Sequence, residues 1–236
     1  MSLKEKFIFN FIEQDRWKYL WDGLGATLKV TFFALVVGVV IGVVVAIIRS
    51  THDKNAKDMK GVSKGILAVL NLIARAYLTV IRGTPVVVQL MIMYYVVMVS
   101  STNKILVATL AFGMNSGAYV AEIFRSGIMS IDNGQFEAGR SLGFNYVQTM
   151  RYIIIPQAFK NVLPTLANEF IVLLKETSVS GYVALHDLTK GGDIIRSRTY
   201  DAFMPLIGVA IIYLAMVMFF TYLVGILERR LRNSER

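Results

Sequence analysis

The hydrophobic pattern divides the chain into five apolar segments, at roughly 24–48, 62–99, 105–126, 153–175 and 203–228. The first and last contain stretches without a charged residue, Val30–Ile48 and Phe203–Leu227. Each stretch exceeds the roughly 18 apolar residues that indicate a membrane-crossing helix. Hydrophobic residues make up 55% of the sequence, which favours an integral membrane protein over a soluble protein with a large core. We therefore expect an all-α integral membrane protein.

The second apolar segment is too long for one straight span, and the residues RGTP at 82–85 interrupt it. It can be one long bent helix or two spans joined by a tight turn. Lys and Arg gather in the connections 49–64, 125–151 and 229–236, which the positive-inside rule places in the cytoplasm. An even number of crossings must then separate the first two connections. One bent helix plus segment 105–126 satisfies this condition, whereas a hairpin does not.

This reasoning predicts five transmembrane helices, with the second long and bent at RGTP, the N-terminus outside and the C-terminus cytoplasmic. The outer connection 176–202 carries Lys190, Arg196 and Arg198, which fit the rule poorly. Residues 1–23 are expected to be an amphipathic, extracytoplasmic segment, 24–228 one membrane domain, and 229–236 a basic cytoplasmic tail. We expect no cleavable signal, because the first apolar run is too long and lacks a small-residue cleavage site.

Polar residues recur at helical spacing within the three middle segments, so each segment has a polar stripe on one face. The stripes consist of Asn71, Arg75, Arg82 and Gln89; of Asn115, Tyr119, Glu122 and Ser126; and of Gln157, Asn161, Pro164, Asn168 and Lys175. Polar groups in hydrocarbon are costly unless they are paired or hydrated. The stripes therefore predict a polar path, although hydrogen bonds between helices alone would also explain them.

Glu169 lies beside this path, next to Asn168. It can bind a substrate amine, or it can pair with Lys175 or Arg75. Gly83, Thr84 and Pro85 predict a structural break, because proline removes one helical hydrogen bond. Such breaks occur in membranes where protein or a cavity satisfies the freed backbone groups.

The polar connection before the fourth apolar segment predicts a helix from Gln135 to Tyr152, with an apolar ridge at Leu142, Tyr146 and Met150. Glycine inside a helix costs roughly 1 kcal/mol relative to alanine. Gly139 and Gly143, at spacing four, are therefore best explained by the close approach of another backbone. That neighbour can be a partner protein or the chain's own helical bundle.

The same stretch reads E-A-G-x3-G-x9-I-x-I-P from Glu137 through Ala138, Gly139 and Gly143 to Pro156. It resembles the "EAA" loop of permease subunits of ABC importers, with Gly139 in place of the second alanine and Ile155 in place of leucine. Further stretches resemble the histidine- and glutamine-type importers of polar amino acids, so that the likeness covers roughly 24–231. They are RGTPVVVQ at 82–89, NSGAYVAEIFRSGI at 115–128, GQFEAGRSLG at 134–143, PQAFKNVLPTLANEFIVLLKETSV at 156–179 and LERRL at 227–231.

The resemblance implies a permease subunit of an ATP-driven importer in the bacterial cytoplasmic (inner) membrane, which moves a polar amino acid inward. Its partners would be an ABC ATPase dimer, a second permease subunit (identical or paralogous) and an extracytoplasmic amino-acid-binding protein. The coupling loop at 127–152 would dock onto the ATPase through Glu137, Ala138, Gly139, Leu142, Gly143 and Tyr146. The chain itself would be no enzyme and bind no cofactor, with ATP and magnesium on the partner.

The stripes and breaks assign the remaining candidate residues. The substrate pathway is predicted to include Gln89, Asn115, Glu122, Gln157, Asn161, Asn168 and Glu169; the structural breaks are Gly83, Thr84, Pro85, Pro156 and Pro164. We place Pro156 in the first turn of the re-entering helix, where a missing N–H costs least. Cationic, anionic and neutral polar substrates all fit this set.

Several motifs are missing from the sequence. It has no phosphate-binding loop of the Walker type and no nucleophile elbow. Its two histidines, His52 and His186, lack metal-ligand spacing, so no metal is expected, and we interpret His186 with Asp187 as a solvated pair. No nucleic-acid-binding module accompanies the basic residues. Two alternatives remain: a secondary transporter or channel acting without an ATPase, and a membrane enzyme using Glu122, Glu169 or His186.

Overall fold

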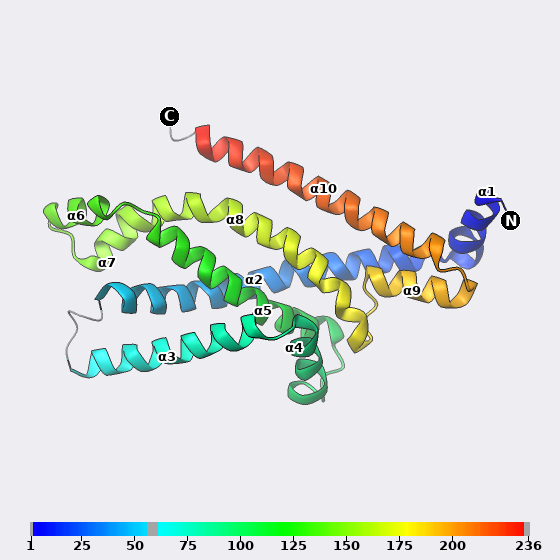
Figure 1. The fold of residues 1–236 in the computed structure, drawn as a ribbon, viewed down its shortest axis with the longest axis horizontal. Coiled ribbons are helices and arrows are strands. Elements are labelled where there is room, and N and C mark those ends of the chain that lie inside the picture. Colours follow the sequence, from blue (N-terminus) through cyan, green and yellow to red (C-terminus); the bar gives the residue numbers. More distant parts are fainter. Residues whose placement is uncertain (1, 56–60, 234–236) are drawn as a thin grey trace. The chain divides into compact units, whose positions relative to one another are not determined.

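The computed structural model describes residues 2–55 and 61–233, although it leaves out the side chains of Asn55, Arg232 and Asn233. Within these ranges the chain forms helices joined by short turns, with no strand (Figure 1). The all-helical prediction is therefore confirmed. Lys57, Lys60 and Arg236, which the topology prediction used, lie outside the described residues.

The helices group into two compact units. Unit 1 takes the described residues of Met1–Val37, Thr84–Gly113 and Phe170–Leu223, and unit 2 takes those of Gly38–Gly83, Met114–Glu169 and Val224–Arg236. Four helices contribute residues to both units. They are α2 (Trp17–Asn55), α5 (Lys104–Met129), α8 (Ile155–Glu176) and α10 (Phe203–Asn233).

Unit 1 begins with a short N-terminal segment of three helical turns, α1 (Leu3–Phe7), η1 (Ile8–Ile12) and η2 (Glu13–Asp15). The segment packs against the beginning of α10, where the Phe11 ring covers Gly208. The buried amide of Asn10 donates a 2.9 Å hydrogen bond to Asp201. Trp17 and Trp21, at the beginning of α2, stay exposed.

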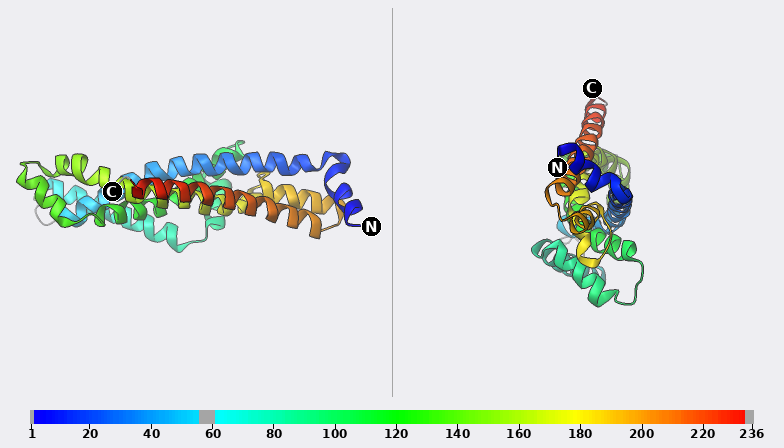
Figure 2. Two further views of the ribbon diagram at one scale, coloured as in Figure 1. Left: turned by 90° about the horizontal axis from the view of Figure 1, so that it is seen from above. Right: turned by 90° about the vertical axis from the view of Figure 1, so that its right-hand side faces the viewer.

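The rest of unit 1 consists of short helices between the long ones. They are α4 (Val86–Ile92), η3 (Met93–Val97), η5 (Thr177–Val183) and α9 (Leu188–Thr199). Leu90, Phe112 and Leu173 form the centre of one apolar core, and Leu20, Leu188 and Ile195 the centre of a second. Figure 2 shows α9 lying beside the N-terminal part of α2. A Cβ at Gly191 would lie 2.4 Å from the Tyr19 carbonyl oxygen, so this close approach requires glycine.

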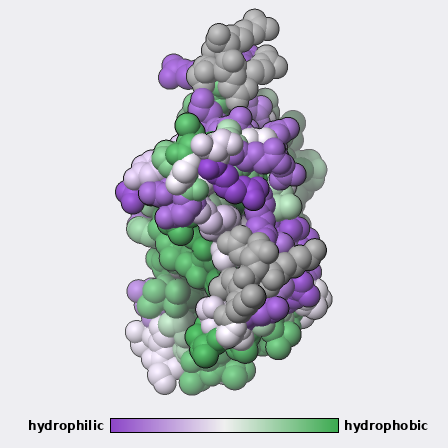
Figure 3. Space-filling model, turned by 90° about the vertical axis from the view of Figure 1, so that its left-hand side faces the viewer, coloured by the Kyte–Doolittle hydropathy of each residue, from purple (hydrophilic) through white to green (hydrophobic). Residues whose placement is uncertain are grey.

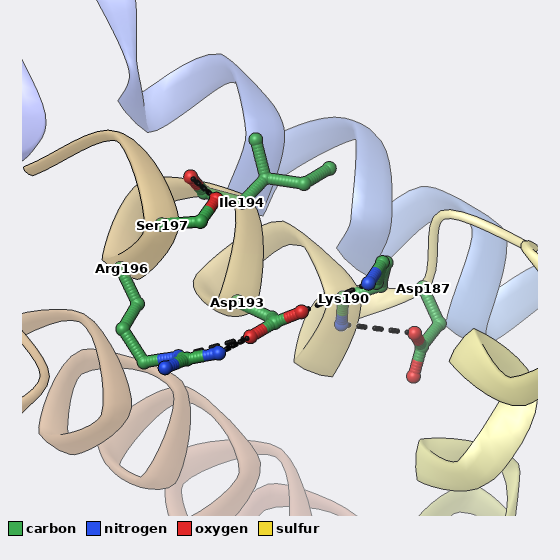
Figure 4. Close-up of polar contacts among 6 residues, drawn as sticks. All are labelled: Asp187, Lys190, Asp193, Ile194, Arg196 and Ser197. Atoms are coloured by element: carbon green, nitrogen blue, oxygen red, sulfur yellow. Dashed lines mark hydrogen bonds and ion pairs between the residues drawn. The ribbon is translucent and has the colours of Figure 1, made fainter. Parts of the chain in front are cut away.

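The connection into α9 holds a buried carboxylate, shown in Figure 4. Asp187 is the N-cap of α9 and accepts a 3.0 Å hydrogen bond from the Lys190 backbone N–H. Its side chain is 1% exposed, and its Oδ2 has no hydrogen-bond partner among the described residues. Burial raises the pKa of Asp187 to about 6. The expected solvated His186–Asp187 pair is therefore wrong for Asp187, because the cap draws this side chain inward.

Unit 2 contains α3 (Val62–Gly83), α6 (Asn133–Ser141), α7 (Tyr146–Thr149) and the π-helical turn η4 (Met150–Ile154), with parts of the long helices. The helices α2, α3 and α5 share an apolar core around Val45, Leu78 and Ala121. The helices α5 and α8 meet where a Cβ at Gly127 would lie 2.3 Å from Val162 Cγ2. This second close contact fixes the distance between the two helices that carry polar stripes.

The chain is interrupted at the predicted position, because α3 ends at Gly83 and α4 begins at Val86 with Pro85 as its N-cap. A residue before proline disfavours the helical conformation, which explains why Thr84 leaves the helix. The expected single bent helix is therefore two helices. Of the other two predicted breaks, Pro156 lies in the first turn of α8 and Pro164 lies inside this helix.

Four helices of the described residues are long and apolar enough to cross a membrane: Trp17–Lys54, Val62–Gly83, Lys104–Met129 and Phe203–Leu231. The fifth predicted span, α8, is not among them, and its polar residues Gln157, Asn161, Asn168 and Lys175 lower its hydropathy. The membrane class of the protein is confirmed by the four apolar helices.

Candidate functional site

The polar stripes of α5 and α8 meet at a cavity of about 640 Å³ within unit 2. We call it the polar cavity. It is lined by five residues of α5, the following Ser130 and three residues of α8, namely Tyr119, Glu122, Ile123, Ser126, Gly127, Ser130, Asn161, Thr165 and Glu169. Glu122, Asn161 and Glu169 had been assigned to the substrate pathway from the sequence, and the fold brings them to one cavity.

Two hydrogen bonds join α5 and its C-terminal turn to α8 in this region. The Ser116 hydroxyl donates to Glu169 Oε1 at 2.8 Å, and the Asn161 amide donates to the Ser130 hydroxyl at 3.2 Å. Neither serine was assigned to the site from the sequence. The only available signal was the spacing of Ser130 from Ser126, which continues the α5 stripe by one turn.

A second cavity, of about 610 Å³, lies between α2, α3 and α5 in unit 2. We call it the arginine cavity, because Arg49, Arg75 and Arg82 line it together with Thr79, Tyr119 and Glu122. Arg82 lies 3.7 Å from Glu122 as an ion pair and 5.9 Å from the centre of the Tyr119 ring. The α3 stripe thus faces the same two α5 residues, Tyr119 and Glu122, that line the polar cavity.

Glu122 also belongs to a longer chain of charges. Arg125 lies 3.4 Å from Glu122 and 3.5 Å from Asp53, so the charges link α3, α5 and the end of α2. These side chains are about one-third exposed, and such pairs contribute at most about 1 kcal/mol each. Their role is therefore to position the α5 carboxylate rather than to stabilise the fold.

The other predicted pathway residues lie outside the polar cavity. Asn115 is buried in α5, and Gln157 bonds to Gln135 and to the Ile153 carbonyl. The Asn168 amide donates to the Pro164 carbonyl at 3.2 Å. Gln89 belongs to unit 1, where its amide donates to Thr84 Oγ1 at 2.9 Å.

The predicted coupling residues lie on a helical hairpin rather than on one helix. The helix α6 ends at Ser141, and Gly143 adopts the left-handed conformation, with φ +78°. The Gly143 and Phe144 N–H groups then bond to the carbonyls of Arg140 and Gly139, which closes the end of α6. The expectation of a continuous helix from Gln135 to Tyr152 is wrong, because a glycine at this position stops the helix.

The two glycines of this segment serve different purposes. A Cβ at Gly139 would lie 2.6 Å from Thr149 Cγ2, so α6 and α7 pack closely against each other. A Cβ at Gly143 would meet no atom within 4 Å, so Gly143 is required by the backbone conformation alone. The close approach inferred for both glycines is present inside the chain at Gly139 only.

The hairpin has a buried side and an exposed side. Phe136 is buried, and the Lys54 ammonium lies over its ring, while Tyr146 is half-buried and burial raises the pKa of its hydroxyl. Glu137, Ala138, Leu142 and Gly143 are exposed. Figure 3 looks onto the side that carries α6 and α7, and hydrophilic residues cover much of its coloured upper part. A cavity of about 570 Å³ beside Lys54, Glu137 and Arg140 opens on this hairpin.

No group of three His, Asp or Glu residues that could hold a metal ion exists within 2–55 and 61–233. The chemistry of the two cavities is instead that of hydrogen bonds and fixed charges. Such cavities can bind and release a polar solute without making or breaking covalent bonds.

Residues 61–233 match the family described as binding-protein-dependent transport system inner membrane component. The chain belongs to this family of ABC transporter permeases, which are multi-pass proteins of the bacterial inner membrane.

The chain is similar over its length to curated members of the family. It is 35% identical to the putative glutamine transport system permease protein GlnP of Rickettsia typhi, over 90% of this chain and 93% of the relative. It is 32% identical to the arginine transport system permease protein ArtQ of Bacillus subtilis, over 92% and 94%. A solved structure of an amino acid ABC transporter with histidines is 42% identical, with a TM-score of 0.78 over 90% of this chain and 94% of that one.

Proposed function

We propose that this chain is the pore-forming permease subunit of an ATP-driven importer that carries a polar amino acid into the cytoplasm. Family membership and the named relatives support the importer class. The observation that carries the assignment of a path is the polar cavity, where Glu122, Asn161 and Glu169 gather from two helices that also contain long apolar faces.

Five spans remain our proposal for the topology, with α8 crossing the membrane in addition to the four apolar helices. The polar residues Asn161 and Glu169 that lower the hydropathy of α8 line the polar cavity. A polar side chain that faces such a cavity avoids the desolvation penalty of hydrocarbon. The proposed orientation keeps the N-terminus outside and places the α6–α7 hairpin in the cytoplasm.

The hairpin of α6 and α7 is the proposed docking element for a separate ATPase subunit. Its exposed residues Glu137, Ala138, Leu142 and Gly143 belong to the segment that resembles the EAA loop. The packing of Gly139 against Thr149 makes the hairpin a compact unit that can transmit a displacement. In this proposal ATP and magnesium bind to the ATPase dimer, and the permease has no enzymatic role of its own.

A second permease subunit and an extracytoplasmic binding protein complete the proposed assembly. The exposed polar residues of the stripes would face the second permease subunit across the path, where water and solute compensate them. Relatives named for glutamine, arginine and cystine support an amino acid as the solute. Glu169 is proposed to accept the ammonium group that all three share.

The test is the ATPase activity of the co-purified complex in lipid, with and without the cognate binding protein. A panel of amino acids is loaded onto the binding protein, and we expect one loaded form to stimulate the activity. If the purified chain retains no ATPase and instead moves solute down an ion gradient in liposomes, the secondary-transporter alternative replaces the importer.

A further inference from the structure

The arginine cavity has a charge imbalance that the fold itself does not compensate. Three arginines and one glutamate line it, which leaves a formal net charge of +2. Within the described part of the chain, the one ion pair between lining residues joins Arg82 to Glu122. Arg49 and Arg75 have no ion pair there, and the buried Nε of Arg49 lacks a hydrogen-bond partner. A buried donor without a partner calls for an explanation, and a bound anion beside these arginines is one that also offsets the charge.

The geometry of the guanidinium group indicates which class of ligand the cavity can bind. The planar fork of arginine binds carboxylate and phosphate oxygens through paired hydrogen bonds. Thr79 and Tyr119 add hydroxyl groups to the same lining. The cavity is therefore suited to an oxyanion rather than to a cation or an apolar group.

The position of the arginine cavity favours a carboxylate that arrives from the polar cavity. Tyr119 and Glu122 line both cavities, so one pair of α5 side chains forms their common wall. Arg82 lies beside both members of this wall, with the ion pair to Glu122 and with its guanidinium over the Tyr119 ring, 5.9 Å from the ring centre. This wall therefore stands between Glu169, in the polar cavity, and the arginines of the arginine cavity.

We propose that the arginine cavity is an anion-binding station that receives the α-carboxylate of the transported amino acid, with Arg75 and Arg49 as its principal ligands. This inference rests on the proposed function. Glutamine, arginine and cystine have different side chains but share the α-ammonium and α-carboxylate groups. In this proposal Glu169 binds the α-ammonium group and the arginines bind the α-carboxylate. The path therefore recognises the two groups that all these amino acids share.

The proposal is tested by binding measurements on the assembled importer in phosphatidylcholine nanodiscs, without the binding protein. The probes are L-glutamine and L-arginine, each compared with its α-carboxamide, which lacks the carboxylate charge. We expect Arg75→Gln to weaken binding of the amino acids roughly 10- to 100-fold, as for the loss of a charged hydrogen bond. Binding of the carboxamides should stay unchanged, and Arg75→Lys should restore part of the affinity.

Arg151→Gln is the matched control, because Arg151 is an exposed arginine of the same unit and does not line the arginine cavity. This control should leave the difference in affinity between each amino acid and its carboxamide unchanged. The proposal would be overturned if Arg75→Gln weakened binding of the amino acids and of their carboxamides equally, or if it weakened neither.

Two further measurements distinguish an amino acid carboxylate from the other oxyanions that could bind in the arginine cavity. Inorganic phosphate is added to the same nanodiscs, and phosphatidylglycerol replaces part of the lipid. Competition by either at equal or higher affinity than the amino acid overturns the carboxylate assignment in favour of a phosphate or lipid headgroup. Stimulation of the ATPase by the loaded binding protein is measured in parallel, so that failure of this inference is distinguishable from failure of the importer function.

Discussion

Ser116 on α5 donates a 2.8 Å hydrogen bond to the carboxylate of Glu169 on α8. Ser116 is fully buried, whereas Glu169 is half-buried and lines the polar cavity. The serine therefore holds one carboxylate oxygen toward α5 and fixes the direction in which the charge is presented. A proposed substrate-binding group is thus oriented by a neighbouring helix rather than by its own.

Replacement of Glu169 by glutamine tests whether transport needs the negative charge of this side chain, because the two side chains have nearly the same shape. We expect Glu169→Gln to keep the contact with Ser116 and to lower transport at least 10-fold, because the amide cannot neutralise a substrate ammonium group. Co-purification of the ATPase should be unchanged. The measurement is uptake of a labelled amino acid into proteoliposomes. Loss of complex assembly with normal uptake by the remaining complexes would contradict this role.

Replacement of Gly127 tests the packing of α5 on α8. A Cβ would lie 2.3 Å from Val162 Cγ2, so Gly127→Ala should destabilise the chain by about 1–3 kcal/mol, as overpacking does. Adding Val162→Ala removes the clashing methyl groups and should recover much of this loss. Thermal unfolding of the detergent-solubilised protein measures the four members of the cycle. Strictly additive effects would show that the two side chains do not meet.

Replacement of Gly143 tests the backbone conformation of the hairpin. A β-branched residue is strained at φ +78°, and Gly143→Val should cost about 1–2 kcal/mol and impair coupling of transport to ATP hydrolysis. Asn tolerates the left-handed conformation better, so Gly143→Asn should be milder. Gly225→Ala is the control, since its Cβ meets open space within α10. A larger effect for Asn than for Val, read by ATPase coupling and thermal unfolding, would contradict the assignment.

Asp187 makes stability depend on pH. Its pKa is about 6 in the folded protein, above the ordinary value of 3.8, so the folded protein binds this proton more tightly than the unfolded chain. Stability should therefore fall as pH rises from about 4 to about 6, by roughly 3 kcal/mol at most. Asp187→Asn keeps the N-cap and should remove this decline.

The neighbouring carboxylate provides the opposite control. Lys190 and Arg196 hold the pKa of Asp193 below its ordinary value, so its contribution to stability is lost as pH falls. The difference in melting temperature between Asp193→Asn and the unchanged protein should therefore be largest above pH 4. An unaltered decline between pH 4 and pH 6 in Asp187→Asn would show that another group causes it.

The long apolar helices and the break at Pro85 could be predicted from the sequence because their signals are local. An uncharged run such as Val30–Ile48 has few alternatives to a helix, and Pro85 lacks the N–H that α3 would need to continue. The stripe on α8 was equally local, and its member Asn161 lines the polar cavity together with Glu169, which lies beside the stripe.

Features that depend on tertiary contacts were not predictable in this way. The sequence spacing of Gly139 and Gly143 is that of two positions on one helix, yet the left-handed conformation of Gly143 ends the helix between them. Asp187 has the composition of a surface loop, but packing of the α9 N-terminus against α2 buries it. Tyr119 and Glu122 could be recognised as lining both cavities only from the packing of the four helices α2, α3, α5 and α8.

The placement of the two tryptophans has a practical consequence. The chain contains two tryptophans, Trp17 and Trp21, and both are exposed at the beginning of α2 in unit 1. Intrinsic fluorescence of this subunit therefore originates at one end of one unit, and no tryptophan of unit 2 contributes. With tryptophan-free partners, the emission would report events near the N-terminal segment without any label, and brominated lipids would measure the depth of that segment in the bilayer by quenching.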